Sequence, residues 1–91
     1  MKAVIQRVKQ GSVAVDGRET GRIGRGMVVL LGIGKQDGDR ETEFLMNKLL
    51  TLRIFPGEKG EFDRSITDIQ GEILVVSQFL NDGPVTFILE S

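Results

Sequence analysis

The sequence predicts an α+β fold, a mainly antiparallel β-sheet assembly of barrel-like character with one long helix. Short apolar segments with a two-residue period recur through the first third of the chain and again near its end. A single stretch carries apolar residues at the three- and four-residue spacing of a helix. Turn-forming residues separate these segments, and no linker or internal repeat divides residues 1–91, so we expect a single domain.

The N-terminal third is expected to form a meander of short strands. Residues 3–8 are rich in β-forming side chains, and residues 12–16 alternate between apolar and polar ones. The dipeptide Asp16-Gly17 favours a two-residue hairpin turn, because both of its positions tolerate positive φ. A return strand is therefore expected over residues 18–23.

The next two segments are expected to form the centre of the fold. Residues 27–34 are apolar on both faces, which predicts a central strand covered on both sides. Residues 39–52 should form the helix, whose acidic start suits the positive end of the helix dipole. Pro56-Gly57 cannot continue a helix, so it should end at residues 52–55. The predicted apolar stripe consists of Leu45, Leu49 and Leu52 together with Met46 and Leu50.

The remainder of the chain again favours strands. Residues 58–63 form a polar, hairpin-like stretch, and residues 72–79 read as a second buried strand. Residues 81–84 are dense in turn formers. Residues 85–89 are expected to close the chain as a strand.

Composition excludes several kinds of enzyme. The chain has no cysteine and no histidine, so Cys/His zinc sites, Ser-His-Asp catalysis and Cys-His catalysis are ruled out. The glycines of residues 21–26 and 32–35 lack the spacing of a nucleotide-binding loop, and the carboxylates of residues 37–43 lack the pattern of a Ca²⁺ loop. We therefore expect no cofactor and no metal. No apolar run approaches the ~20 residues of a membrane span, so a cytoplasmic protein without a membrane partner is expected.

The charges are distributed unevenly. Residues 1–35 hold seven basic and two acidic side chains, a net charge of +5, whereas residues 36–91 hold five basic and eleven acidic ones, a net charge of −6. This asymmetry is compatible with a basic face that meets phosphate. An ordinary solvated surface is the simpler interpretation of charge alone.

Two blocks near the C-terminus carry the candidate functional residues. Ser77, Gln78 and Phe79 end an otherwise apolar strand, where unpaired polar side chains are costly, so they indicate a functional role. The second block contains Gly83-Pro84, and X-Pro is the one kind of peptide bond that adopts the cis form at low cost. From the residues alone, a plain turn is the simpler interpretation of the second block.

These two blocks resemble the signature motifs of the D-aminoacyl-tRNA deacylase family. Leu74–Phe79 matches the first signature, and Asn81–Thr86 matches the second. The sequence departs from the family where Leu80-Asn81 follows Phe79, since the family continues with Thr-Leu. The long stretch that the family carries between the two signatures is missing. Further similar segments occur in the same order as in the family, at residues 3–8, 28–32 and 52–55.

The resemblance implies a deacylase-like fold and hydrolysis of the ester that joins a D-amino acid to tRNA, a chiral proofreading step in translation quality control. Mischarged glycyl-tRNA is implied as a further substrate. Catalytic roles fall on Ser77, Gln78 and Phe79, which line the ester pocket. The family is a homodimer in which the cis Gly-Pro turn of one subunit enters the site of the other and repels L-residues. The implied substrate-binding residues are Gly83, Pro84, Arg7, which steadies the turn, Asn81 and Thr86.

The expected chemistry does not use a protein nucleophile. The ribose 2′-hydroxyl would help to activate water, and backbone N–H groups near Phe79 would stabilise the oxyanion. The expected partners are the 3′ end of aminoacyl-tRNA and a second copy of the chain, with no DNA. Two alternatives remain: an inactive RNA- or protein-binding remnant of the deacylase scaffold, and an inert fragment that self-associates through an exposed edge.

Overall fold

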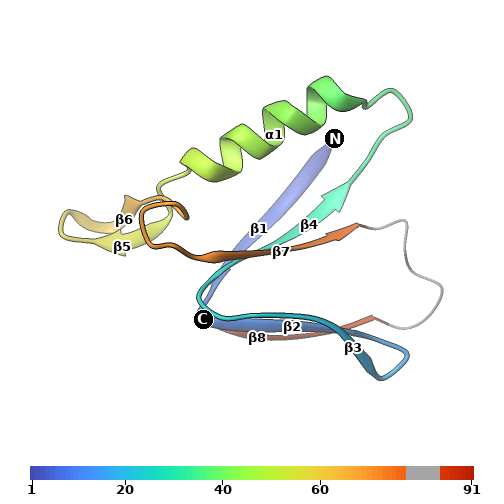
Figure 1. Ribbon diagram of the computed structural model, residues 1–91, viewed down its shortest axis with the longest axis horizontal. Helices are drawn as coiled ribbons and strands as arrows, with labels where there is room; N and C mark the ends of the chain where they lie inside the picture. Colours follow the sequence, from blue (N-terminus) through green and yellow to red (C-terminus); the bar gives the residue numbers. More distant parts are fainter. Residues whose placement is uncertain (78–84) are drawn as a thin grey trace.

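The computed structural model describes residues 1–77 and 85–91. They form two three-stranded sheets, a two-stranded hairpin and one helix, as shown in Figure 1. The predicted α+β class is therefore confirmed. In chain order the elements are β1 (Lys2–Val8), β2 (Gln10–Val15), β3 (Arg18–Ile23), β4 (Gly26–Gly32), α1 (Asp39–Thr51), β5 (Phe55–Gly57), β6 (Gly60–Arg64), β7 (Glu72–Ser77) and β8 (Val85–Glu90).

The first sheet has the order β1-β4-β7, with β4 at its centre. β1 runs antiparallel to β4 and β7 runs parallel to it, so that Met27 lies between Arg7 of β1 and Ile73 of β7. The side chains of Met27, Val28 and Val29 are all buried. The predicted central position is confirmed, because a strand needs neighbours on both edges and layers on both faces to bury such a run. The predicted cover over residues 27–34 holds for the first half only: Leu30 and Leu31 are half-buried, the strand ends at Gly32, and Ile33 is 36% exposed.

β7 differs from the prediction of a second buried strand. Its one strand partner among the described residues is β4, none of its residues is buried, and Val75 is 47% exposed. The apolar pattern of β7 resembles that of β4, but periodicity does not record how many neighbours a strand has. The apolar run therefore lies at the edge of the described sheet.

The second sheet has the order β3-β2-β8. Asp16 and Gly17 both have positive φ, at 53° and 75°, which confirms the two-residue turn between β2 and β3. A register shift between Val13 and Ala14 interrupts the β2–β3 pairing. β8 pairs antiparallel with β2, so the predicted closing strand is confirmed.

Two cores follow from the alternation of side chains along β4. Met27 and Val29 point to one face of the first sheet, where they pack with Leu49 of α1 and with Phe55 and Ile66. On the opposite face, buried Val28 packs in a smaller cluster toward the second sheet. β4 therefore joins the helix layer to the second sheet. The residues of the smaller cluster are Val8, Ile23 and Val28, with Leu74 packed against them.

The helix lies where the sequence predicts it. Gly38 is its N-cap, and the backbone N–H of Gly38 donates to Oε2 of Glu41 over 2.9 Å. Leu49 is 1% exposed, but Met46 and Leu50 are 43% and 42% exposed, so the apolar stripe is narrower than expected. The first sheet covers only one side of a single helix, and residues at the margin of the stripe stay in contact with solvent. Within the described part, no helix is long and apolar enough to cross a membrane.

The turn after β6 is fixed by a reciprocal pair of hydrogen bonds. The backbone N–H of Ser65 donates to Oδ2 of Asp68 over 3.0 Å, and the backbone N–H of Asp68 donates to Oγ of Ser65 over 3.1 Å. The hydrogen bond from the backbone of Ser65, and to a smaller extent that with its side chain, holds the pKa of Asp68 below its ordinary value of 3.8. This turn places buried Ile66 in the larger core and directs the chain into β7.

Candidate functional site

The C-terminal end of β7 holds the first of the predicted catalytic residues. Ser77 is the last residue of β7, lies opposite Leu31 of β4 and is partly buried. Alternation along the strand places it on the same face as Val75. The other predicted residues of this region lie outside the described residues, namely Gln78, Phe79, Asn81, Gly83 and Pro84.

A cavity of about 430 Å³ lies beside Ser77, between the two sheets. Its lining is mostly apolar, and Ser77 and Thr20 are the two lining residues with hydroxyl side chains. Ser77 shares the face of Val75, which is the helix side of the first sheet, so it borders the cavity through its backbone. Ser77 and Val85 flank residues 78–84 in the sequence, and both line this cavity. A largely apolar cavity with a few polar groups is the usual setting of a small-molecule site. The remaining lining residues are Val13, Val15, Leu74, Val75 and Val76.

Thr86 lies on β8, opposite Ala14 of β2. The buried side chain of Val13 lines the cavity between the two sheets and so faces the first sheet, and its partner on β8 is Phe87. Because side chains alternate along a strand, Thr86 lies on the outer face of the second sheet and is exposed there. The structure thus brings Val85, but not Thr86, into the cavity beside Ser77.

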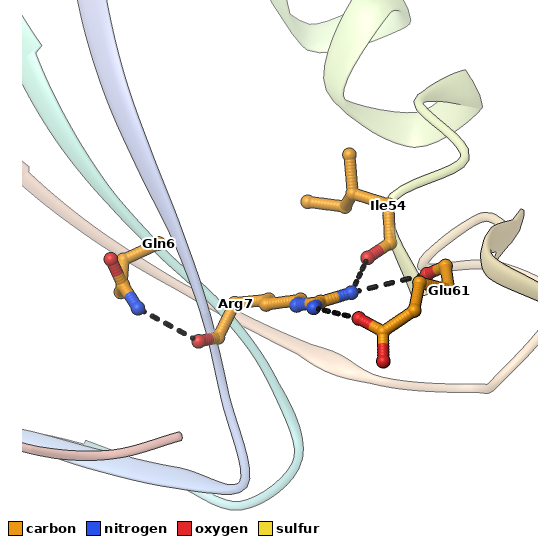
Figure 2. Close-up of polar contacts among 4 residues, drawn as sticks. All are labelled: Gln6, Arg7, Ile54 and Glu61. Atoms are coloured by element: carbon orange, nitrogen blue, oxygen red, sulfur yellow. Dashed lines mark hydrogen bonds and ion pairs between the residues drawn. The ribbon is translucent and has the colours of Figure 1, made fainter. Parts of the chain in front are cut away.

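Arg7 is held by groups of its own chain, as Figure 2 shows. Its Nη1 donates to the carbonyl oxygens of Ile54 and Glu61, over 2.8 and 3.1 Å, and its Nη2 donates to Oε2 of Glu61 over 2.7 Å. Charge-assisted bonds of this kind are the stronger ones in proteins. They fasten β1 to the β5–β6 hairpin and fix the position of the guanidinium group.

Within one chain, Arg7 and Ser77 lie at opposite ends of the first sheet. Arg7 pairs with Met27 of β4, whereas Ser77 pairs with Leu31, four positions further along the same strand. At ~3.3 Å per residue and ~4.8 Å between strands, the two backbones are roughly 16 Å apart. One subunit therefore does not bring its Arg7 to its own Ser77.

A second cavity, of about 390 Å³, lies next to Arg7. Lys9 and Arg25 line it together with Arg7, and Phe55 and Pro56 supply apolar surface. Sequence reasoning did not single out this cluster, whose basic residues come from two separate parts of the N-terminal third. The remaining lining residues are Val8, Glu61 and Ser91.

Phe62 is a further residue near Arg7 that the sequence analysis missed. Its ring is 71% exposed, and the Arg7 guanidinium carbon lies 5.2 Å from the ring centroid. The sequence did contain a sign of this residue: Phe62 is a large apolar side chain within the charged residues 58–64, and an exposed aromatic residue in such a stretch indicates a contact surface.

As for metals, no group of three or more Asp or Glu residues in the described part is arranged to hold an ion.

Comparison with known proteins identifies the family. The sequence profile of the family described as D-Tyr-tRNA(Tyr) deacylase matches residues 4–80. Over 79 residues, or 87% of this chain, it is 54% identical to a D-aminoacyl-tRNA deacylase of Carboxydothermus hydrogenoformans and 56% identical to one of Aquifex aeolicus. These alignments cover 54% and 53% of the two relatives.

A solved structure is similar over nearly the whole fold. It is a c-Myc DNA unwinding element binding protein, 45% identical in sequence, with a TM-score of 0.79. The match covers 98% of this chain and 64% of that one. The chain spans about half the length of the curated relatives it matches. The profile match over most of the chain, with relatives above 50% identity, shows that the protein belongs to the D-Tyr-tRNA(Tyr) deacylase family.

Proposed function

We propose that the protein hydrolyses the ester of D-aminoacyl-tRNA and so removes wrongly attached D-amino acids during translation. The observation that carries this proposal is the family match over residues 4–80, which includes β7 and every residue that lines the cavity beside Ser77 except Val85. The substrate places the activity in the cytoplasm, at the 3′ end of a bound tRNA. Mischarged glycyl-tRNA is a further substrate, because glycine has no side chain for a chiral screen to reject.

The proposed chemistry uses the substrate and the backbone instead of a protein nucleophile. The chain contains neither histidine nor cysteine. The ribose 2′-hydroxyl next to the ester helps to activate the attacking water, which adds to the ester carbonyl. Backbone N–H groups near Phe79 stabilise the resulting oxyanion. The bond between the acyl carbon and the ribose oxygen then breaks, the ribose oxygen takes up the proton that the water has lost, and the free amino acid is released. Ser77 and Gln78 line the pocket around the ester.

The chiral screen is assigned to the Gly83-Pro84 turn of a partner subunit. Backbone groups of this turn repel an L-side chain, so specificity comes from rejecting the wrong enantiomer. Asn81 and Thr86, which flank this turn in the sequence, are the further proposed substrate-binding residues. Arg7 steadies the turn with the donors that remain: a guanidinium has five N–H groups, and the bonds to Ile54 and Glu61 use three.

The proposed assembly is a homodimer. Arg7 and Ser77 lie far apart within one chain, so a site that uses both residues takes them from two subunits. A domain of this size buries only ~60–65% of the surface that its unfolded chain exposes, and Ile88 remains 69% exposed on β8. We expect light scattering at micromolar concentration to return twice the 10.0 kDa mass of one chain. A stable species of 10.0 kDa across that range would contradict the dimer.

The activity is tested with tyrosyl-tRNA charged with D- or L-tyrosine. We expect D-Tyr-tRNA to lose its amino acid well above the buffer rate, while L-Tyr-tRNA does not. A third substrate, in which the terminal ribose lacks its 2′-hydroxyl, should react about 100-fold more slowly than D-Tyr-tRNA, because assistance by a general base typically contributes at least that factor.

Two outcomes would overturn the proposal. Hydrolysis of the D- and L-substrates at equal rates would show that the site does not distinguish the two enantiomers. Release of D-tyrosine at the buffer rate by protein that is folded, as judged by circular dichroism, would favour the alternative of a non-catalytic remnant that binds RNA or protein. In the second case, filter binding of uncharged tRNA would tell an RNA-binding remnant from an inert fragment.

A further inference from the structure

We propose that the cavity beside Arg7 binds backbone phosphate of single-stranded RNA, with an adjacent base stacked on Phe62. The proposal rests on the proposed function for the identity of the RNA, which would be the 3′ end of tRNA. It adds a contact region for the RNA that lies at the opposite end of the first sheet from Ser77 of the same chain, next to the partner's turn that Arg7 is proposed to steady. The features that carry it are the unpaired cations of the cavity, the rigid placement of Arg7 and the exposure of the neighbouring ring.

Lys9 and Arg25 supply positive charge that the chain does not neutralise. Both side chains are exposed and line the cavity of about 390 Å³. None of the ion pairs or side-chain hydrogen bonds found within residues 1–77 and 85–91 involves either side chain. Cations lining a concave surface concentrate positive potential there, which favours an anion such as a phosphodiester.

The anionic groups of the same cavity do not cancel this charge. Glu61 is already paired with Arg7 through the 2.7 Å contact to Nη2. Arg25 also lies over the Phe55 ring, with its guanidinium carbon 6.0 Å from the ring centroid, and this contact does not neutralise its charge. A phosphate that enters therefore meets the positive charges of Lys9 and Arg25, which form no ion pair among the described residues.

Phe62 provides the second element of a single-stranded site. Its ring is 71% exposed, and the Arg7 guanidinium beside it is anchored to Glu61 and to the carbonyl of Ile54. Proteins that bind single strands combine a basic groove for the backbone with aromatic rings on which bases stack. Apolar surface from Phe55 and Pro56 completes the lining between the cations.

Phe44 on the helix is a second exposed aromatic residue, and it differs from Phe62 in its position relative to the Arg7 cavity. Phe44 of α1 is also exposed, at 64%, and Nζ of Lys48 lies 5.7 Å from its ring centroid. Phe44 is not among the residues that line the Arg7 cavity. Phe62, in contrast, lies against Arg7, which is a lining residue. Phe44 is therefore a control with the same ring and the same type of neighbour.

The test measures binding of a short, uncharged single-stranded RNA with the sequence of a tRNA 3′ end. We expect the Lys9→Ala, Arg25→Ala double variant to bind about 50-fold more weakly at about 50 mM salt, with a salt slope shallower by about 1.4, because each phosphate contact to a single strand contributes about 0.7. Phe62→Ala should lose about tenfold in affinity. The matched controls are Lys35→Ala, Arg40→Ala, which removes the same charge elsewhere, and Phe44→Ala; both should bind within about twofold of the parent.

The uncharged RNA separates this proposal from the deacylase activity. If the parent hydrolyses D-Tyr-tRNA but the double variant binds RNA as tightly as the parent, only the cavity assignment fails. If the parent binds and the variants weaken binding while hydrolysis is absent, only the proposed enzymatic activity fails. The cavity assignment is also overturned if the parent does not bind the RNA at low salt, or if a polyglutamate peptide binds with equal affinity and equal sensitivity to the variants. DNA of the same sequence that binds as tightly would support contacts to phosphate and base without contacts to the 2′-hydroxyl.

Discussion

Replacing Gly26 with alanine is expected to destabilise the protein by about 3 kcal/mol, a large part of the total stability of a domain this small. Gly26 is buried at the start of β4, between Val8 of β1 and Glu72 of β7. A Cβ atom at this position would collide with the carbonyl oxygen of Glu72. That oxygen belongs to the backbone of a paired strand, so it cannot rotate away, and β7 would have to move. Urea unfolding should show a midpoint lower by about 1–2 M.

Gly24→Ala is the matched control for this variant. Gly24 precedes the same strand, and within the described part of the chain an added Cβ would closely approach only Oε1 of Glu72, at 3.2 Å. That oxygen accepts an exposed hydrogen bond from the Gly24 N–H over 2.8 Å, and the end of a glutamate side chain can shift at the cost of weakening this bond. We therefore expect a loss of about 1 kcal/mol or less. Equal midpoints for the two variants would mean that β4 and β7 do not approach each other as closely as the structure places them.

Leu49→Ala is the second substitution with a large expected effect, also about 3 kcal/mol. Leu49 is 1% exposed and packs in the core formed with Met27, Val29 and Phe55. The loss combines the transfer free energy of the removed atoms with that of the cavity left behind. Leucine and alanine both favour helices, so the change in helix propensity contributes little. The measurement is again the free energy of unfolding in urea.

Leu50→Ala, one residue further along α1, separates burial from position in the helix. Leu50 is 42% exposed and is not part of either core cluster. We expect less than about 1 kcal/mol of destabilisation from this variant. A loss as large as that of Leu49→Ala would indicate that the outer side of α1 is covered in solution, and the mass from light scattering would then identify a second copy as the cover.

Local features of the fold could be predicted because the residues that determine them are close in sequence. The turn at Asp16-Gly17 depends on two adjacent residues that tolerate positive φ. The helix depends on a spacing of three and four residues within one stretch. The central position of β4 could also be predicted, since an uninterrupted apolar run needs cover on both faces.

Features that depend on distant residues were not accessible in the same way. Arg7 contacts groups 47 and 54 positions away, and no local pattern in β1 indicates Ile54 or Glu61 as its partners. The exposure of Val75 likewise depends on how many strands adjoin β7. Ser77 was predicted from its place at the end of an apolar strand, but the cavity beside it depends on Val13 and Val85 from the second sheet.

The pairing pattern has a consequence for how the chain acquires its structure during synthesis. Gln10 of β2 pairs with Glu90 of β8, and Gly26 of β4 pairs with Glu72 of β7. Each three-stranded sheet is therefore completed by a strand that is synthesised long after its partner: β8 after β2, and β7 after β4. Until then, β2 and β4 each carry a row of unsatisfied backbone groups, and non-local pairings of this kind form slowly. The edge of β2 that β8 covers consequently stays unpaired for longest, until synthesis reaches residue 90, and it is open to pairing with other chains during that time.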